Sequence, residues 1–111
     1  MSSEVYSFDI VVAGGTSTTT VTEHHAGAVV SVYAASTCTS GTPRSISSIT
    51  CGGKLNIIGN ATTAAIADEG NAQYEQTELG GTALDGGNIV VTMSGEVDGS
   101  GAVTVTIYVA P

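Results

Sequence analysis

The sequence predicts an all-β fold: an antiparallel β-sandwich or small β-barrel of about seven or eight short strands, with at most one short helix. Three observations predict it: apolar and polar residues alternate in several segments, turn signals recur about every ten residues, and the composition favours strands and turns. The 111 residues include 16 Thr, 12 Ser and 15 Gly, and only 11% are charged. Because no linker or composition break divides the chain, we expect a single domain over residues 1–111.

The N-terminal third predicts three strands. Residues 5–12 alternate, which is typical of a strand with one buried face. Residues 16–23 are rich in Thr and favour an exposed or edge strand. Residues 24–27, His-His-Ala-Gly, indicate a turn. Residues 28–35 carry apolar side chains on both faces, as an interior strand does.

The middle of the chain has weaker signals. Residues 36–50 predict a loop with room for a short strand, and residues 54–59 predict another short strand. Residues 60–70 are the one helical candidate, with Asn60 as a possible N-cap, and either one or two helical turns or a structured loop would fit them. Residues 72–79 suggest a polar strand.

The C-terminal segment has the clearest alternation, in residues 88–94 and 102–109. Asp98-Gly99 lies between the two segments, and Asp-Gly is a strong signal for a tight turn. We therefore expect these two strands to pair as an antiparallel hairpin.

The charge balance excludes some partners. The net charge is −8, and Arg44 and Lys54 are the two bases of the chain. Phosphate backbones and anionic membranes attract clustered Lys and Arg, so we expect neither a nucleic-acid nor a membrane partner. The acidic surface either keeps the protein soluble or attracts a basic patch on a partner. The chain starts without a signal-peptide pattern and has no apolar run of about 20 residues, so we expect synthesis in the cytoplasm.

Cysteine usage leaves two alternatives open. Cys38 and Cys51 flank a segment with turn signals and could form a disulfide, which would contribute roughly 3 kcal/mol. They could equally be two buried thiols of a protein made in a reducing compartment.

No motif in the sequence assembles a reactive or metal-binding centre. In Glu23-His24-His25, adjacent side chains on a strand would point to opposite faces, and the chain has no third His, so an exposed turn is the better interpretation. The acidic turns 85–88 and 98–101 fit ordinary turn chemistry better than a calcium loop. The chain also lacks a Gly-x-Ser-x-Gly elbow. We expect no catalytic residue, no metal site and no cofactor.

Three segments carry a family resemblance: the start (residues 1–10), the Thr-rich run (16–23) and the end (88–95 followed by 102–109). With its acidic composition, the chain resembles the head decoration (cement) proteins and other minor virion proteins of tailed bacteriophages. The resemblance implies a β-sandwich or barrel on the exterior of the capsid that clamps neighbouring major capsid subunits, often as a homotrimer. It implies the major capsid protein as the partner, and it carries over no catalytic residues.

Two other functions remain open from the sequence. One is a surface-binding or adhesion module at a fibre tip or on an envelope, which would use loops such as residues 36–51. The other is a secreted or pilus-like structural subunit, which would need a leader and an oxidised Cys38–Cys51 pair.

Overall fold

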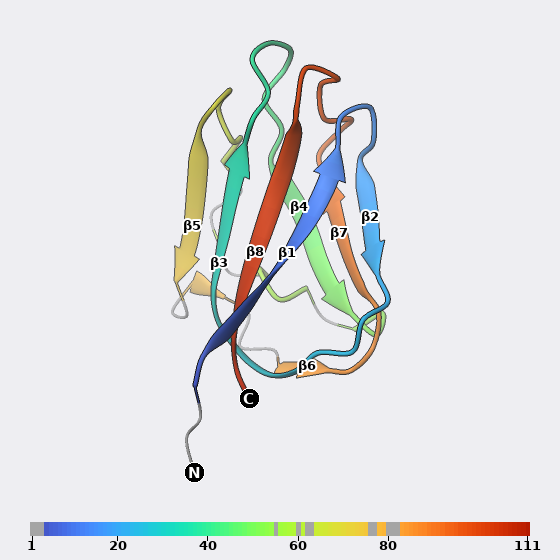
Figure 1. The fold of residues 1–111 in the computed structure, drawn as a ribbon, viewed down its shortest axis with the longest axis vertical. Coiled ribbons are helices and arrows are strands. Elements are labelled where there is room, and N and C mark those ends of the chain that lie inside the picture. The colour runs from blue at the N-terminus through green and yellow to red at the C-terminus, as the bar shows by residue number, and fades with distance from the viewer. Residues whose placement is uncertain (1–3, 55, 60, 62–63, 76–77, 80–82) are drawn as a thin grey trace.

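The fold is a β-sandwich of two antiparallel sheets packed face to face (Figure 1). The structure is a computed structural model that describes residues 4–54, 56–59, 61, 64–75, 78, 79 and 83–111. Eight strands are described: β1 (Tyr6–Ala13), β2 (Thr18–Val21), β3 (Ala26–Ser36), β4 (Ile46–Cys51), β5 (Asn71–Glu75), β6 (Ala83–Asp85), β7 (Ile89–Met93) and β8 (Ala102–Ala110). The sandwich form of the prediction is confirmed, and the sheets do not close into a barrel.

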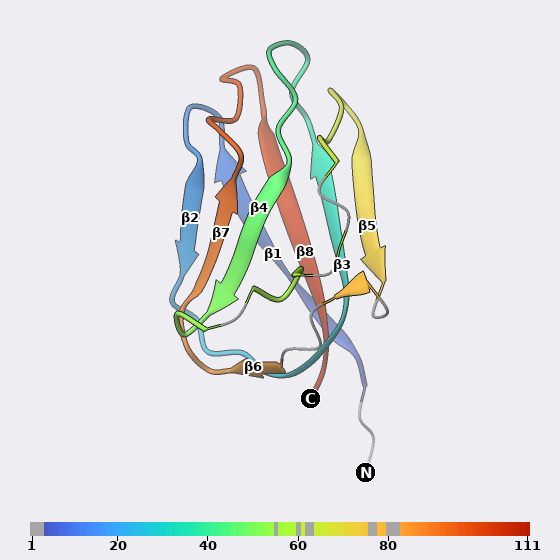
Figure 2. The same ribbon diagram turned by 180° about the vertical axis from the view of Figure 1, so that it is seen from behind.

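The chain alternates between the two sheets for most of its length. The larger sheet has the strand order β1-β8-β3-β5, with β6 also pairing β3, and the smaller sheet has the order β2-β7-β4. Figure 2 shows the smaller sheet in front of the larger one. β3 is an interior strand and β2 is an edge strand, as predicted for residues 28–35 and 16–23.

The core lies between the sheets and is built by alternation. β8 shows the rule most clearly, because Val103, Val105, Ile107 and Val109 are buried while the residues between them are half-buried on the outer face. The largest fully buried side chains come from both sheets and the connections: Ile10, Ile46, Ile49, Ile57, Ile58, Ile89, Ile107, Val12, Val32, Val91, Val97 and Val105.

The predicted hairpin of the last two strands is wrong. β7 pairs with β2 and β4, whereas β8 pairs with β1 and β3, so the link around Asp98-Gly99 crosses from one sheet to the other. The physical reason is Val97, which is buried within that link. Its carbonyl accepts from the Gly15 N–H at 2.6 Å and its N–H donates to the Thr16 carbonyl at 2.9 Å, which ties the link to the β1–β2 turn.

Two further predictions change in the middle of the chain. Residues 54–59 do not form a strand: Asn56 makes one bridge with Thr50, and Leu55 lies outside the described residues. Ile57 and Ile58 are both buried. In a strand with one buried face, successive side chains point to opposite faces, so one of the two would be exposed. Of the helical candidate, residues 61 and 64–70 are described and contain no helix, so the structured loop holds there; residues 60, 62 and 63 lie outside the described part.

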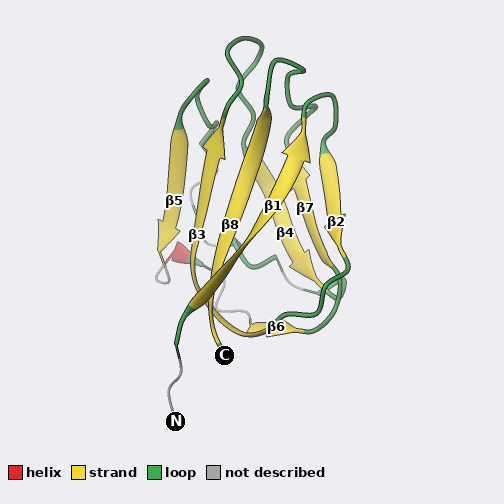
Figure 3. Cartoon of the chain, in the orientation of Figure 1, coloured by secondary structure: helices red, strands yellow, loops and turns green. Residues whose placement is uncertain are grey.

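Loops gather at the two ends of the sandwich (Figure 3). The start of β1 and the end of β8 lie at the end where β6 closes the molecule, which we call the β6 end (Figure 1). The predicted turn at 24–27 is shorter than expected, because Ala26 and Gly27 already pair with β6 as part of β3. None of the described residues belongs to a helix with the length and apolar character that crossing a membrane requires.

Candidate functional site

The two histidines lie in different environments and do not form a pair. His24 is exposed, and its Nδ1 donates to the Gly86 carbonyl at 2.6 Å. The His25 ring lies flat on Phe8, with ring centroids 3.6 Å apart and planes inclined by 2°. Among the described residues, no group of three or more His, Cys, Asp or Glu side chains could hold a metal ion.

His25 fixes the first half of β1 to the connection between β2 and β3. Besides stacking on Phe8, its Nδ1 lies 3.2 Å from the Tyr6 hydroxyl. Its Nε2 is buried without a hydrogen-bond partner and lies 4.0 Å from Glu23 Oε1. These contacts hold Tyr6 and Phe8 of β1 in place.

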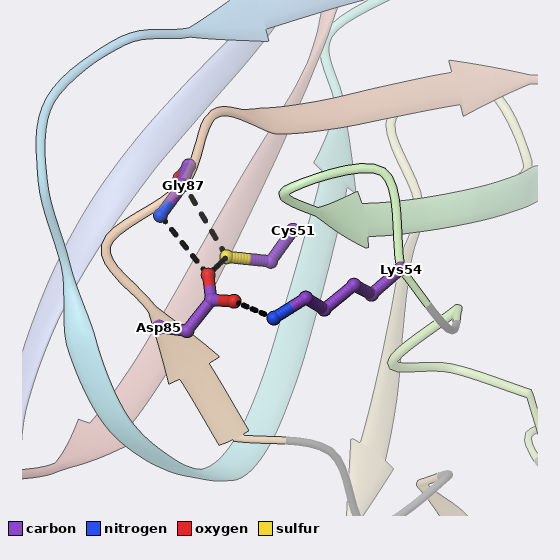
Figure 4. Close-up of polar contacts among 4 residues, drawn as sticks. All are labelled: Cys51, Lys54, Asp85 and Gly87. Atoms are coloured by element: carbon purple, nitrogen blue, oxygen red, sulfur yellow. Dashed lines mark hydrogen bonds and ion pairs between the residues drawn. The ribbon is translucent and has the colours of Figure 1, made fainter.

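A polar cluster joins both sheets at the β6 end (Figure 4). Asp85, the last residue of β6, accepts hydrogen bonds from the Cys51 thiol at 3.2 Å and from the Gly87 N–H at 3.0 Å. Its second oxygen accepts from Lys54 Nζ at 2.6 Å. Because Cys51 ends β4 of the smaller sheet and Asp85 ends a strand paired with β3, the cluster joins the two layers.

The electrostatics of this cluster favour the charged carboxylate. The hydrogen bond from Lys54, with those from Gly87 and Cys51, holds the pKa of Asp85 well below its usual range. The same contact with Asp85 raises the pKa of Lys54. The hydrogen bonds that Asp85 accepts come from the end of β4 and from the turns at Lys54 and Gly87, so this acidic turn has a structural role in the fold.

Asp98 organises the opposite end of the sandwich in a similar way. Its carboxylate accepts from the Ser100 N–H at 2.9 Å and from the Ser40 hydroxyl at 3.4 Å. Hydrogen bonds from the side chain and backbone of Ser100 lower the pKa of Asp98. The adjacent hollow, which Cys38 and Asp98 help to line, holds about 10 Å³, room for about one water molecule.

Cys38 and Cys51 are free and buried, so the structure has two separate thiols and no disulfide between them. Cys38 donates to the Asp98 carbonyl at 3.5 Å, whereas Cys51 contacts Asp85 at the β6 end. Both thiols are used as hydrogen-bond donors inside the fold.

The outer face of the larger sheet is a broad surface with little charge. Tyr33 and Tyr108 lie half-buried near its centre, on the adjacent strands β3 and β8. Thr, Ser and Ala side chains and Gln73 lie beside them, and each edge strand carries a carboxylate on this face: Asp9 on β1 and Glu75 on β5. Neither base lies on this face, because Lys54 pairs with Asp85 and Arg44 donates to the Glu96 carbonyl at 3.0 Å.

Comparisons with protein-family models, curated proteins and solved structures find no match for this chain.

Sequence reasoning placed the acidic turns and histidines but did not identify the outer face. Its one signal was Val11, an apolar residue on the side of residues 5–12 that otherwise carries Ser7 and Asp9. Val11 is 51% exposed, and with Val5, at 53%, it is one of the two large apolar side chains exposed among the described residues.

Proposed function

We propose that this chain is a structural virion protein that binds the exterior of a bacteriophage capsid and stabilises it by contacting major capsid subunits. The observation that supports the proposal best is the outer face of the larger sheet, with Tyr33 and Tyr108 at its centre and without Lys or Arg. Tyrosines are enriched at the centres of protein interfaces, where they bury a large area at a small entropy cost.

The shape of the protein suits a clamp. Many side chains on the outer face of the larger sheet are small Thr, Ser and Ala residues, which allow close approach of another protein surface. Many modest contacts to several capsid subunits add up, because each contact after the first is effectively intramolecular. The polar clusters at both ends keep the sandwich rigid, which lowers the entropy cost of binding.

The test uses empty capsids prepared without this protein from the phage that carries the gene. Adding the purified protein should raise the temperature at which the capsids disassemble, followed by light scattering and by the number of copies that co-sediment. The double variant Tyr33→Ala with Tyr108→Ala should lose this effect. Val90→Ala, which alters a half-buried outward residue of the smaller sheet, serves as the matched control and should retain it.

Two results would contradict the proposal. If capsids disassemble at the same temperature with and without the protein, it is not a clamp. If the Val90→Ala and tyrosine variants behave alike, the outer face of the larger sheet is not the binding surface.

A further inference from the structure

β1 lies at an edge of the larger sheet, and half of its peptide groups point away from the sheet. In an antiparallel pair, the N–H and C=O of one residue point to the same side, and successive residues alternate. The Ala102 carbonyl accepts from Thr37, which follows β3, so even-numbered residues of β8 face β3 and odd-numbered ones face β1. In the observed register, the peptide groups of Phe8 and Ile10 bond to β8, while those of Ser7 and Asp9 point away from β8 at the open edge of the sheet.

Two hydrogen bonds made by the carbonyls of β1 confirm which of its peptide groups face away from β8. The Thr19 hydroxyl donates to the Val11 carbonyl at 3.0 Å, and the Thr16 N–H donates to the Ala13 carbonyl at 3.1 Å. Both carbonyls therefore face away from β8, in step with Ser7 and Asp9. The second half of β1 is thus partly covered by the start of β2, whereas the first half is not.

The outward peptide groups of Ser7 and Asp9 make no hydrogen bond within the described part of the chain. Two other edges carry such bonds: the Ile49 carbonyl on β4 accepts from the Ile57 N–H at 2.8 Å, and the Glu75 N–H on β5 donates to Glu78 Oε2 at 2.7 Å. The first half of β1 is an open template for another strand.

The side chains of β1 do not protect this edge. Natural edge strands are commonly protected by Lys, Pro or a bulge. β1 has no Lys or Pro, and its pairing with β8 is continuous over eight residue pairs. Val11 is exposed on the outer face of the strand, and Val5, which directly precedes the strand, is exposed as well. The stacking of His25 on Phe8 holds this half of the strand in place, so the edge is formed in advance.

The charge around the edge indicates the chemistry of its occupant. Glu4 precedes the strand, Asp9 lies within it, and Glu23 is next to His25, with no Lys or Arg on β1 or its neighbours β8 and β2. A second copy of this chain, also at net charge −8, would bring two Asp9 carboxylates onto one face with no base opposite them. An extended segment with Lys or Arg opposite Asp9 and an apolar residue opposite Val5 fits instead.

We propose that the first half of β1 is a strand-addition site that binds an extended, basic and partly apolar segment of a partner protein. Within the proposed function, on which this identification of the partner rests, that segment belongs to a major capsid subunit. Backbone hydrogen bonds to Ser7 and Asp9 supply affinity, and the Asp9 carboxylate supplies the preference for a basic strand.

The test uses a blocked synthetic peptide in which valine alternates with lysine and threonine, and a matched peptide with glutamate in place of lysine. Amide hydrogen exchange, followed by NMR, should show that the lysine peptide slows the Ser7 and Asp9 amides. The Phe8 amide, already bonded to β8, should change little. The glutamate peptide should bind at least about threefold more weakly than the lysine peptide.

Two pairs of variants separate the backbone from the charge. Ser7→Pro removes an N–H that faces outward, so the β1–β8 hydrogen bonds stay intact, and it should weaken peptide binding about tenfold or more. Ser7→Ala keeps the N–H and should bind as the wild type does. Asp9→Asn keeps an acceptor for the Thr106 hydroxyl, 2.7 Å away in the native protein, and should lose the preference for lysine over glutamate.

Several outcomes would overturn the inference. Unchanged exchange at Ser7 and Asp9, or equal binding by the Ser7→Pro and Ser7→Ala proteins, excludes strand addition at this edge. Protection of these amides that rises with protein concentration alone would assign the edge to a second copy. If Ser7→Pro binds capsids as tightly as the wild type does, the strand-addition site is wrong and the proposed function stands. If the wild type binds the peptide but not capsids, the strand-addition site stands and the proposed function is wrong.

Discussion

At the scale of single residues, Asp85 links the stability of the fold to pH. Its pKa is lowered in the folded state, chiefly by Lys54, so its stabilising contribution is complete above the unfolded pKa of about 3.9. That contribution is lost as the pH falls from there towards the folded pKa. We expect the unfolding temperature of the wild type to exceed that of Asp85→Asn at pH 6, and the difference to shrink below about pH 4.

Thermal unfolding monitored by circular dichroism between pH 3 and pH 7 measures this difference. Glu96→Gln is the matched control, because the Glu96 residue is exposed and its side chain makes no hydrogen bond to any residue that the structure describes. A constant difference between wild type and Asp85→Asn across this range would mean that Asp85 acts through its shape and not through its charge.

His25 gives a prediction in which two substitutions differ in the size of their effect on stability. Its ring stacks on Phe8, but its Nε2 is buried without a hydrogen bond. His25→Ala removes the stack and should lower the free energy of unfolding by about 1–2 kcal/mol. His25→Phe keeps a stacked ring and removes the unpaired Nε2, but it also loses the contact between Nδ1 and the Tyr6 hydroxyl, so the two changes offset and the free energy of unfolding should change by about 0.5 kcal/mol or less. Urea unfolding at pH 8 decides, and equal losses in both variants would show that the stack contributes nothing.

At the scale of elements, alternation predicted the strands well but could not predict their partners. The inward set of β1, ending in Ile10 and Val12, follows directly from the period of two. Strand order depends on contacts between residues far apart in the chain, and the buried Val97 that separates β7 from β8 sits beside a strong hairpin signal. The candidate edge was missed for the same reason: the sequence placed Ser7 and Asp9 on an outer face but did not show that β1 ends a sheet.

Two of the connections that cross between the sheets, the β1–β2 turn and the β7–β8 link, pack tightly against each other. A Cβ at Gly14, in the β1–β2 turn, would meet the Gly101 carbonyl and lie 2.7 Å from the Asp98 carbonyl, both of them backbone atoms that cannot rotate away. Gly14→Ala should therefore lower the free energy of unfolding by about 1–3 kcal/mol. Gly99→Ala, in the same link but with no atom within 4 Å of its Cβ, should change it by about 0.5 kcal/mol or less. Chemical denaturation compares the two, and a tolerated Gly14→Ala would show that the connections can separate.

At the scale of the whole molecule, the net charge of −8 should control how fast the protein meets its partner. Both bases are already engaged, Lys54 by Asp85 and Arg44 by the Glu96 carbonyl, so the remaining surface attracts cations. Charges outside a buried contact act mainly on the association rate, and the Debye length falls from about 10 Å at 0.1 M salt to about 3 Å at 1 M.

We therefore expect association with immobilised capsids to slow about tenfold between 50 mM and 500 mM sodium chloride, while dissociation changes little. Biolayer interferometry gives both rates separately. Asp9→Asn should reduce the salt dependence more than Glu69→Gln does, because Asp9 lies next to the proposed strand-addition site, whereas Glu69 lies in the loop before β5. An association rate that rises with salt would indicate repulsion between the protein and the capsid, and a partner surface that is acidic rather than basic.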